Sequence, residues 1–427
     1  MERKHEVFSA LAAAAVVILS CASPAGAQLA TASASTLGLG GNATATARGI
    51  SAISMNPAGL GMPGSGFTLA LVPIQVRTGL SPVTLRDIKD FGGTVIPVSA
   101  KEDWLSRAEA EGSETGSVGI DVSGLALSAG HLGFQLSTIA HGNVDLSPEI
   151  LQLILYGNAG RTGQAVDISF GGSALDAFAA TTGALSFGLP LPSLKGSMAI
   201  GATLKYTVGH AVVVGRAQGG GVQSDPLRVS VDFPVVTIDD TDPGMNAGSG
   251  VGVDLGFQMK RDRVSLGAAV LNVFNTFSWD ESKLFYRPGQ ALFEQGTNRT
   301  DFDQQPYSAA PAAVRETVVN MTFDPTIAVG GGYDVNPDFT VSADLRNRFG
   351  DGLDVGPKLH AGVGAEYHGL SALYLRGGGA VVSGGFEISG GLSLILGPVN
   401  LSLAAGLRQA DLGDESLGQF TLSFGGR

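Results

Sequence analysis

The sequence contains very little cysteine and few charged residues. Cys21 is the only cysteine among 427 residues and lies near the start of the chain, which excludes disulfide scaffolds, cysteine-ligated metal sites and thiol catalysis. Charged residues make up 15% of the chain, whereas a soluble domain has about 25%. The 26 Lys and Arg residues are outnumbered by 38 Asp and Glu residues, and the resulting net charge of -12 would repel nucleic acids.

Long hydrophobic runs are also missing after the N-terminal segment, although 44% of the residues are hydrophobic. Residues 388–407 come closest, but their apolar positions alternate and Gly397-Pro398 interrupts them, so they predict a hairpin of two strands. The hydrophobic content excludes disorder, and the 63 glycines lack the three-residue period of collagen. The composition therefore indicates a glycine-rich, acidic β-protein.

Residues 1–27 predict a cleaved signal peptide, which places the mature protein in the cell envelope. A basic start is followed by an apolar run from Val7 to Leu19 and by small residues at Ala25-Gly26-Ala27. The run is shorter than the ~20 residues that a membrane-spanning helix needs. The alternative is a lipoprotein signal in which Cys21 is lipidated, although the preceding residues fit that pattern poorly.

Apolar and polar side chains alternate along many segments of the chain. From Phe339 to Leu345 every odd position is apolar and every even position is polar, and residues 249–260 and 357–367 follow the same period of two. A tilted strand needs about ten residues to cross a bilayer, whereas strands of soluble sandwiches usually have about five or six. We therefore predict an all-β fold, a transmembrane antiparallel β-barrel.

Short turns and longer loops alternate between these segments, as in outer-membrane barrels, whose short turns face the periplasm. The six short turns lie near 129–131, 192–196, 260–263, 335–338, 368–369 and 397–398, and the seven loops near 79–116, 144–172, 217–248, 278–316, 349–356, 379–383 and 408–416. The fourteen predicted strands are 66–78, 117–128, 132–143, 173–190, 196–216, 249–260, 263–277, 317–333, 338–348, 357–367, 370–378, 384–396, 398–407 and 417–424. Two more strand-like segments, 164–171 and 226–238, are assigned to external loops; in the wall they would make sixteen strands.

Three segments within the predicted loops have helical character. They are Val83–Phe91, Lys101–Glu111 and Pro148–Tyr156. Ser147 is a suitable N-cap for the last of them, with Pro148 at the first helical position. The apolar face of that helix consists of Ile150, Leu151, Ile154 and Leu155. Two interpretations of this face are open: it packs over the barrel mouth, or it captures apolar ligands from outside.

Residues 36–62 carry the most specific motif of the sequence. A Gly38-Leu39-Gly40-Gly41 stretch is followed by small residues and then by Asn56-Pro57-Ala58-Gly59-Leu60, just before the first predicted strand. Pro57 disfavours a helical backbone at Asn56, and Gly59 lets the chain bend into the strand. The residues alone fit either a plug inside a barrel or a helix-to-strand connection at its lip.

This combination resembles the N-terminal plug of the FadL-like outer-membrane proteins. The resemblance implies a barrel of about 14 strands over residues 66–427, with residues 28–65 as a plug in its lumen. The sequence departs from the family in two places. Gly425-Gly426-Arg427 follow the last apolar strand where members commonly end in an aromatic residue. The family's transporters also have an inward kink in the third strand that opens a lateral exit, and here only His141-Gly142 could break that strand.

Eight charged or titratable side chains fall on the polar parity of the later strands. They are Asp344, Arg346, Arg348, Lys358, His360, Glu366, Arg376 and Glu387. A charge on the lipid face costs about 2–4 kcal/mol at the membrane centre, so we predict that these side chains face the lumen. Their mixed signs indicate ion pairs between wall and plug. The alternative is a soluble barrel with these charges in outside water.

The sequence contains no motif for catalysis or metal binding. There is no His-Glu-x-x-His, no Gly-x-Ser-x-Gly and no Lys-Ser/Thr after the glycine-rich runs. His360 and His368 are eight residues apart on one predicted strand, about 26 Å, which is too far to share an ion. We therefore predict neither an enzyme nor a bound metal or other cofactor.

The resemblance implies two competing functions for this outer-membrane protein. The first is passive uptake of hydrophobic small molecules, typically fatty acids, gated by the plug. The predicted gate residues are Gly40, Gly41, Asn56, Pro57, Ala58 and Gly59. The second is a scaffold for protein secretion or surface attachment, as in FadL-like relatives of the PorV type. A continuous apolar tunnel would favour uptake and a lumen closed by charges would favour the scaffold; in either case we expect a monomer surrounded by outer-membrane lipid.

Overall fold

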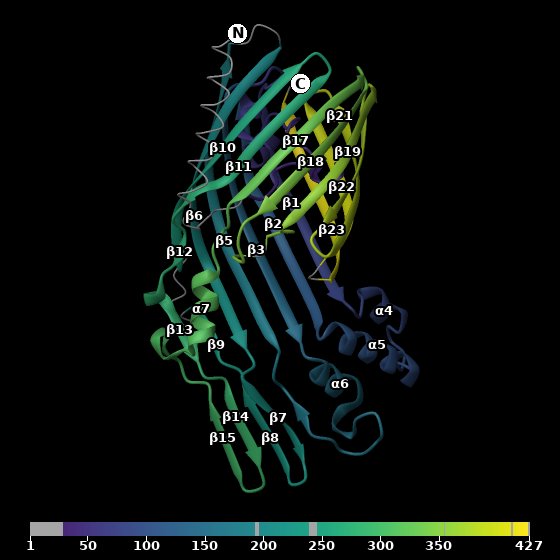
Figure 1. Ribbon diagram of the computed structural model, residues 1–427, viewed down its shortest axis with the longest axis vertical. Coiled ribbons are helices and arrows are strands. Elements are labelled where there is room, and N and C mark those ends of the chain that lie inside the picture. Colours follow the sequence, from purple (N-terminus) through teal and green to yellow (C-terminus); the bar gives the residue numbers. More distant parts are fainter. Residues whose placement is uncertain (1–28, 193–195, 239–245, 354, 411–412, 426–427) are drawn as a thin grey trace, which may run out of the picture.

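Fourteen long antiparallel strands form a closed barrel (Figure 1). The computed structural model describes residues 29–192, 196–238, 246–353, 355–410 and 413–425, so the predicted signal peptide lies outside the described residues. The first barrel strand pairs with the last, which closes the ring. No helix within these ranges is both long enough and apolar enough to span a membrane.

The strand count confirms fourteen rather than sixteen. The barrel strands are β1 (Thr68–Ser81), β2 (Glu114–Ala129), β3 (Leu132–Leu146), β5 (Ala174–Leu191), β6 (Ser197–Arg216), β10 (Gly248–Arg261), β11 (Val264–Asn275), β17 (Thr326–Asn336), β18 (Phe339–Arg348), β19 (Leu359–Leu370), β20 (Leu373–Val382), β21 (Gly385–Leu396), β22 (Val399–Ala410) and β23 (Gly413–Gly425). The short turns gather at one end of the barrel, which we call periplasmic, and the long loops gather at the other.

The wall follows the alternation that the sequence predicts. On β18, Leu345 points outward and is 50% exposed, whereas the neighbouring Asp344 is 5% exposed. On β19, the outward Val363 is 64% exposed and the inward His360 is 3% exposed. An apolar outer surface around a polar interior is the arrangement of a transmembrane barrel, because lipid replaces water outside.

The predicted strand 317–333 is wrong over its first part. Residues 312–320 form the helix α7 (Ala312–Asn320), and the strand β17 begins only at Thr326. Val314 and Val318 lie on one face of α7 and are almost fully buried in a cluster that includes Phe323. A helix forms here instead of a strand because this face packs into the barrel mouth. A local alternation pattern does not reveal such a contact.

Two predicted loops are tight hairpins instead. The ladder between β20 and β21 continues to the pair Val382–Gly385, and Gly384 has a φ of 75° that suits a two-residue turn. The ladder between β22 and β23 continues to the pair Ala410–Gly413. The insertions predicted near 379–383 and 408–416 are therefore extensions of the wall.

The long loops form an external layer beyond the barrel mouth. The three predicted helices are present as α4 (Leu85–Asp90), α5 (Val98–Glu111) and α6 (Pro148–Tyr156). A separate five-stranded sheet projects outward and consists of β15 (Thr297–Asp301), β14 (Gln290–Glu294), β8 (Leu227–Asp232), β7 (Gly219–Ser224) and β4 (Ile168–Ser169). The smaller elements are β9 (Val235–Ile238), β12 (Ser278–Trp279), β13 (Leu284–Arg287), β16 (Gln305–Pro306), η2 (Gly157–Ala159), η3 (Glu281–Lys283) and η4 (Tyr307–Ala309).

Residues 29–62 lie inside the barrel, near its periplasmic end. They form α2 (Ala34–Gly38), which lies against β20 to β23, α3 (Ile50–Met55), which lies against β1, β2, β3 and β5, and η1 (Pro57–Gly61), which lies against β5, β6 and β10. Glycines in the wall allow this close approach. A Cβ atom at Gly201 would lie 2.3 Å from the Ala58 nitrogen, and one at Gly256 would lie 2.1 Å from Asn56 Oδ1. The abundance of glycine thus has a structural use at the contact between wall and plug.

Candidate functional site

Three cavities follow one another along the barrel. The outer cavity lies at the mouth and is lined by His141, Asp176, Arg216, Thr317, Asn320 and Asp351, among others. The central cavity lies between the mouth and the plug. The inner cavity lies at the periplasmic end and is lined by Thr36, Arg48, Lys260, Asp334, Ser342 and Glu366, among others. His141 lines both the outer and the central cavity, and Thr36 lines both the central and the inner cavity.

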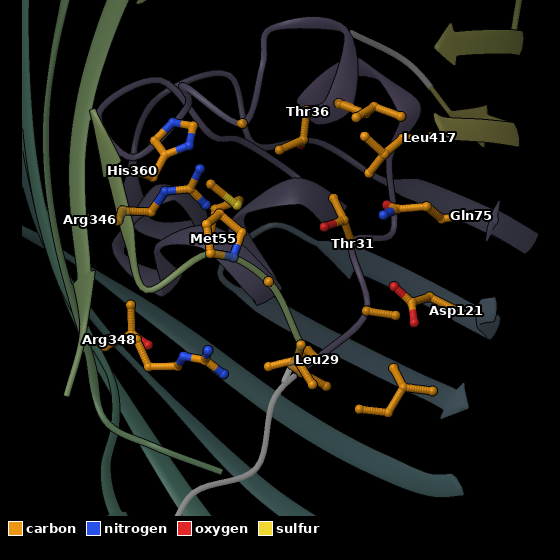
Figure 2. Close-up of a pocket in the computed structure, with 18 of the residues that line it drawn as sticks. Leu29, Thr31, Thr36, Met55, Gln75, Asp121, Arg346, Arg348, His360 and Leu417 are labelled. Atoms are coloured by element: carbon orange, nitrogen blue, oxygen red, sulfur yellow. The ribbon is translucent and has the colours of Figure 1, made fainter. Parts of the chain in front are cut away.

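The central cavity has an apolar part and a charged part (Figure 2). The apolar lining includes Leu29, Leu37, Met55, Ile139, Leu271 and Leu417. The charged lining includes Arg346, Arg348, Lys358, His360, Glu387 and Arg408. Arg346 and Arg348 from β18 and His360 from β19 lie on one side, across from Asp121 of β2. At about 170 Å³ the cavity is smaller than the roughly 300 Å³ that begins the range of drug-sized sites.

Arg346 is the cation of this cavity that lacks a hydrogen-bond partner among the described residues. Among the described residues it makes no hydrogen bond or ion pair, and its Nε is buried without an acceptor. The nearby carboxylates are engaged elsewhere, because Asp344 binds the plug and Glu387 accepts from Arg408 Nε at 2.8 Å. Asp344 and Glu387 attract Arg346 electrostatically, but the guanidinium spends no hydrogen bond on them, so its donors are available to an anionic group that enters the cavity.

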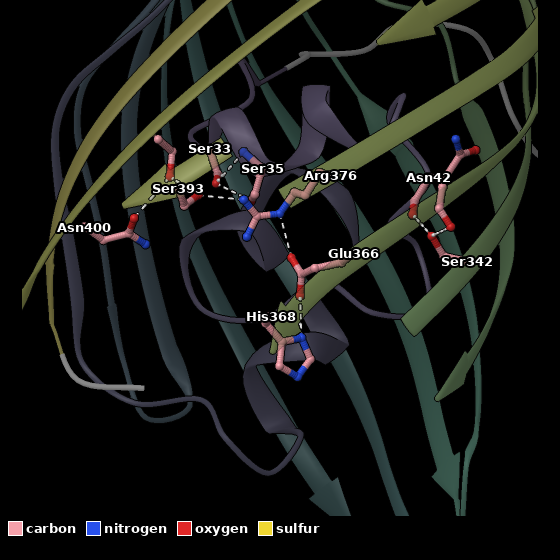
Figure 3. Close-up of polar contacts among 11 residues, drawn as sticks. Ser33, Ser35, Asn42, Ser342, Glu366, His368, Arg376, Ser393 and Asn400 are labelled. Carbon is pink, nitrogen blue, oxygen red and sulfur yellow. Dashed lines mark hydrogen bonds and ion pairs between the residues drawn. The ribbon is translucent and has the colours of Figure 1, made fainter. Parts of the chain in front are cut away.

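Three of the other predicted lumen charges, Glu366, Arg376 and Glu387, are paired within the wall. Arg376 donates to Glu366 Oε2 at 2.6 Å and to Ser393 Oγ at 2.6 Å, and His368 lies beside the same carboxylate (Figure 3). His360 Nε2 lies 3.1 Å from Asn42 Oδ1 of the plug.

Two of the predicted charges lie at the outer end of this wall. Lys358 lies just before β19, is exposed, and pairs with Asp351. Arg348 donates to the carbonyl of Leu353. The structure therefore divides the predicted set into wall pairs, contacts to the plug and rim groups, with Arg346 left over.

The predicted gate residues fall into two different environments. The Asn56 side chain donates to the carbonyl oxygens of Thr44, Phe257 and Ala268 at 2.9, 3.0 and 3.2 Å, and its Oδ1 accepts from the Ala58 nitrogen at 3.2 Å. Pro57 to Gly59 continue this attachment as part of η1, and all of them are buried.

Gly40 and Gly41 are the other part of the predicted gate. They follow α2 with positive φ values of 64° and 76°. A Cβ atom at Gly41 would lie 2.4 Å from Arg346 Nη2, so this glycine makes room for the guanidinium. This turn therefore connects the position of α2 directly to the charged side of the central cavity.

Two charged clusters of the lumen were not singled out from the sequence. Arg77 Nη2 lies 2.7 Å from His141 Nε2, which in turn lies 2.6 Å from Asp121 Oδ1. Lys205 Nζ donates to Asp254 Oδ1 at 2.5 Å, and both are almost fully buried. These residues occupy polar positions in the alternation of their strands, so their inward direction could have been predicted from the sequence. Their pairing could not, because it depends on which strands are neighbours.

The apolar face of α6 is largely covered. Leu151 and Leu155 are buried against Trp104 and Leu105 of α5. Ile150 is partly buried, and Ile154 is the exposed member of the four, at 64%. Half of this apolar face is therefore buried in the external layer itself and is not available to a ligand.

The third strand is continuous. Every residue of β3 from Leu132 to Asp145 has a partner in β5, without a shift of register. The candidate breaker His141-Gly142 pairs normally with Phe178 and Ala177. The kink expected from the family's transporters is therefore absent from β3.

In the part of the chain that the structure describes, no group of three or more His, Cys, Asp or Glu side chains could hold a metal ion. Residues 63–274 match a protein family that is described as a family of unknown function (DUF5723). A comparison with curated proteins gave no match.

Two solved structures have the same architecture over nearly the whole chain. The toluene transporter TbuX of Ralstonia pickettii is 14% identical, with a TM-score of 0.50, and the match covers 94% of this chain and 98% of TbuX. A FadL homologue of Pseudomonas aeruginosa is 13% identical, with a TM-score of 0.50 and coverages of 94% and 99%. At these identities the likeness establishes the fold.

Proposed function

We propose that this chain, which has the fold of the FadL-like outer-membrane barrels, is an outer-membrane channel for passive uptake of small, largely hydrophobic molecules that carry an anionic group. Fatty acids are one class with this chemistry. The observation that carries the proposal is the central cavity, where apolar side chains and the unpartnered Arg346 face the same space.

The lining of the cavities decides which hydrophobic molecules fit. A continuous apolar tunnel, the feature expected for a purely hydrophobic ligand, is not what the three cavities form, because each has charged side chains in its lining. A neutral hydrocarbon in these cavities would displace water from the charged side chains without replacing its hydrogen bonds, which is energetically unfavourable. An amphipathic anion can place its tail on Leu29 and Ile139 and its charge near Arg346. The name of TbuX refers to toluene, a neutral ring, so we propose a different ligand class here.

We propose that the plug is the gate and that its two parts act differently. Asn56 to Gly59 are fastened by side-chain hydrogen bonds to β10 and β11 and are enclosed by glycines of the wall, which suits an anchor. The Gly40-Gly41 turn lies beside Arg346, and the central cavity is too small for a long ligand in its present shape. A shift of the plug at this turn would enlarge the cavity while the anchor holds.

The proposal is tested by measuring the flux of two probes into proteoliposomes that contain the protein. The probes are decanesulfonate and decyltrimethylammonium, which share a tail but carry permanent charges of opposite sign, so neither crosses lipid in a neutral form. We expect the protein to pass the sulfonate preferentially. Arg346→Gln should weaken apparent affinity for the sulfonate about 10- to 100-fold, because a charge-assisted hydrogen bond contributes roughly 1.5–3 kcal/mol.

The matched control is Arg299→Gln, which removes an exposed arginine from β15 outside the barrel and should leave the flux unchanged. If the protein passes neither probe above the level of empty liposomes, uptake is excluded. The scaffold role would then take its place. One observation favours that second role: β15 pairs only with β14 among the described strands, so its other edge is open to a partner strand.

A further inference from the structure

We infer that the ligand leaves the barrel along its axis, through the inner cavity into the periplasm, and that Thr36 is the residue that controls this exit. The inference rests on the proposed function and names the route by which that function is performed. It assigns a specificity-determining position to α2, outside the Asn56 segment on which the sequence motif focuses.

The wall offers no prepared side exit. β3 is paired along its length, and its register with β5 is unbroken. The ladder is interrupted at β11, where Asn272 and Val273 pair with neither β10 nor β17 but the buried Asn272 is hydrogen-bonded to Lys205 and Asp254. It is also interrupted at β1, where Val72 and Pro73 pair with neither β2 nor β23. Behind this point the plug is tightly packed, because Ala32 and Ile50 form a buried cluster with Ala70 of β1 and Ala126 of β2. A sideways route would have to break this cluster.

The axial route consists of three successive cavities. The outer and central cavities share His141, and the central and inner cavities share Thr36. A residue that lines two cavities is part of the partition between them. The partition at Thr36 is thin, because α2 is a helix of five residues, Ala34–Gly38, that lies across the lumen against β20 to β23.

The Thr36 hydroxyl lies at this partition without a hydrogen-bond partner among the described residues. Thr36 is 4% exposed, and its Oγ1 has no hydrogen-bond partner. A buried hydroxyl without a partner costs about 1–3 kcal/mol, so a ligand group that hydrogen-bonds Thr36 Oγ1 would be favoured at this position. A sulfonate or carboxylate that moves from Arg346 toward the periplasm would accept a hydrogen bond from this hydroxyl at the partition.

The inner cavity suits an ionic group in water rather than a hydrocarbon entering lipid. Its lining includes Arg48 of the plug and the ion pair between Lys260 and Asp334, whose nitrogen and oxygen are 2.7 Å apart. Lys260 and Asp334 lie close to the periplasmic turns that end β10 and β17. A ligand that passes Thr36 therefore meets a polar space at the periplasmic end of the barrel.

The anchoring of α2 is compatible with movement. Its N-terminal end is held by one hydrogen bond to the wall, from the Ala34 nitrogen to Thr421 Oγ1 at 2.9 Å, and its C-terminal end runs into the Gly40-Gly41 turn. By contrast, the Asn56 side chain alone donates to two carbonyls of the wall. By hydrogen bonds to the wall, α2 is thus fixed at fewer points than the Asn56 side chain, and its movement would have to open the buried cluster of Ala34 and Leu37 with Ala404 and Leu417.

A reversible thiol block tests this route. The predicted mature chain contains no cysteine, so Thr36→Cys and Val72→Cys each introduce a single thiol, at the partition and on the outer wall. Decanesulfonate flux is measured in proteoliposomes before modification, after a bulky methanethiosulfonate reagent, and after dithiothreitol. We expect modification of Thr36→Cys to lower the flux at least about tenfold, because the added group fills the gate, and dithiothreitol to restore it. Modification of Val72→Cys should leave the flux unchanged.

Each outcome has one meaning. Because every variant is compared with itself before modification, a folding defect is not mistaken for a block. A block at Val72→Cys together with free flux through modified Thr36→Cys would overturn the axial route in favour of a side exit. Free flux through both modified variants would also overturn the role of Thr36. Absence of flux through the unmodified wild-type protein would instead refute the proposed uptake function.

Discussion

The Asp344 carboxylate of β18 accepts two hydrogen bonds from Thr44 of the plug. Asp344 Oδ2 accepts from the Thr44 nitrogen at 2.9 Å and from Thr44 Oγ1 at 2.7 Å. The Ala43 nitrogen adds a third hydrogen bond to the same oxygen, also at 2.9 Å. Wall and plug are therefore joined at a second point, separate from Asn56, by a carboxylate that accepts its hydrogen bonds from the plug.

Replacing Asp344 with Asn should loosen this part of the plug. Hydrogen bonds to a charged group contribute roughly 1.5–3 kcal/mol each, and the amide lowers this contribution and presents a donor where three donors converge. We expect hydrogen exchange at residues 42–47 to accelerate at least about tenfold, since tenfold corresponds to roughly 1.4 kcal/mol. Asp338→Asn, at an exposed periplasmic turn, is the control. Equal exchange in both variants would show that Asp344 does not hold the plug.

Replacing Asn56 with Asp keeps the shape of the side chain but removes its donors. The new carboxylate would face the carbonyl oxygens of Thr44, Phe257 and Ala268, at a cost of about 1–3 kcal/mol for each polar group left unpaired. We expect the barrel to assemble and to keep its heat-modifiable mobility in gels. A protease added at the periplasmic end should cut residues 29–62 in this variant and leave them intact in the wild type. Equal resistance would refute the anchor role.

Replacing Leu345 with Arg should destabilise the barrel by about 2–4 kcal/mol, because this places a charge on the lipid-facing side of the wall. The measurement is urea unfolding in lipid bilayers. Ala343→Leu is the matched control on the same face of β18, and it should be neutral or slightly stabilising. A free energy of unfolding that is unchanged by Leu345→Arg would mean that this face of the strand does not contact lipid.

Acid should loosen α4 in the external layer. Burial acts to raise the pKa of Asp87, but hydrogen bonds from the backbone and side chain of Thr84 and the Arg107 guanidinium outweigh it and lower that pKa. A lowered folded-state pKa means that Asp87 stabilises α4 above its unfolded pKa of about 3.9 and that this contribution is lost as the pH falls through the lower folded value. The protection of residues 85–91 against hydrogen exchange, relative to the intrinsic rate at each pH, should therefore fall below about pH 4, and Asp87→Asn should remove this dependence on pH. An unaltered profile in the variant would contradict the assignment.

The wall could be predicted from the sequence because its determinants are local. Alternation fixes which side chain faces lipid, as at Leu345 and Asp344, and a turn fixes the register of each hairpin. The prediction of a strand over 317–333 was wrong in its first part, where the structure depends on contacts with distant residues. Val314 and Val318 form a helix because of the core they meet at the mouth, together with residues such as Phe277 and Trp279.

The candidate site depended on contacts that no local pattern encodes. Asp344 and Thr44 are 300 positions apart in the chain, and the partners of Glu366 and Glu387 follow from strand order. Parity predicted eight inward charges, but it could not show that Lys358 lies exposed at the rim or that Arg346 makes no hydrogen bond to another described residue. The division of the lumen at Thr36 likewise requires the plug and the wall together.

The pairing of β1 with β23 has a consequence for the biogenesis of the protein. The plug precedes β1 in the chain, and the ring around it is completed only by the last strand. The barrel therefore cannot close around the plug until the last strand has paired with the first. A chain shortened before β23 would leave a sheet with two open edges, next to a plug segment whose partners on β23, such as Thr421, are missing.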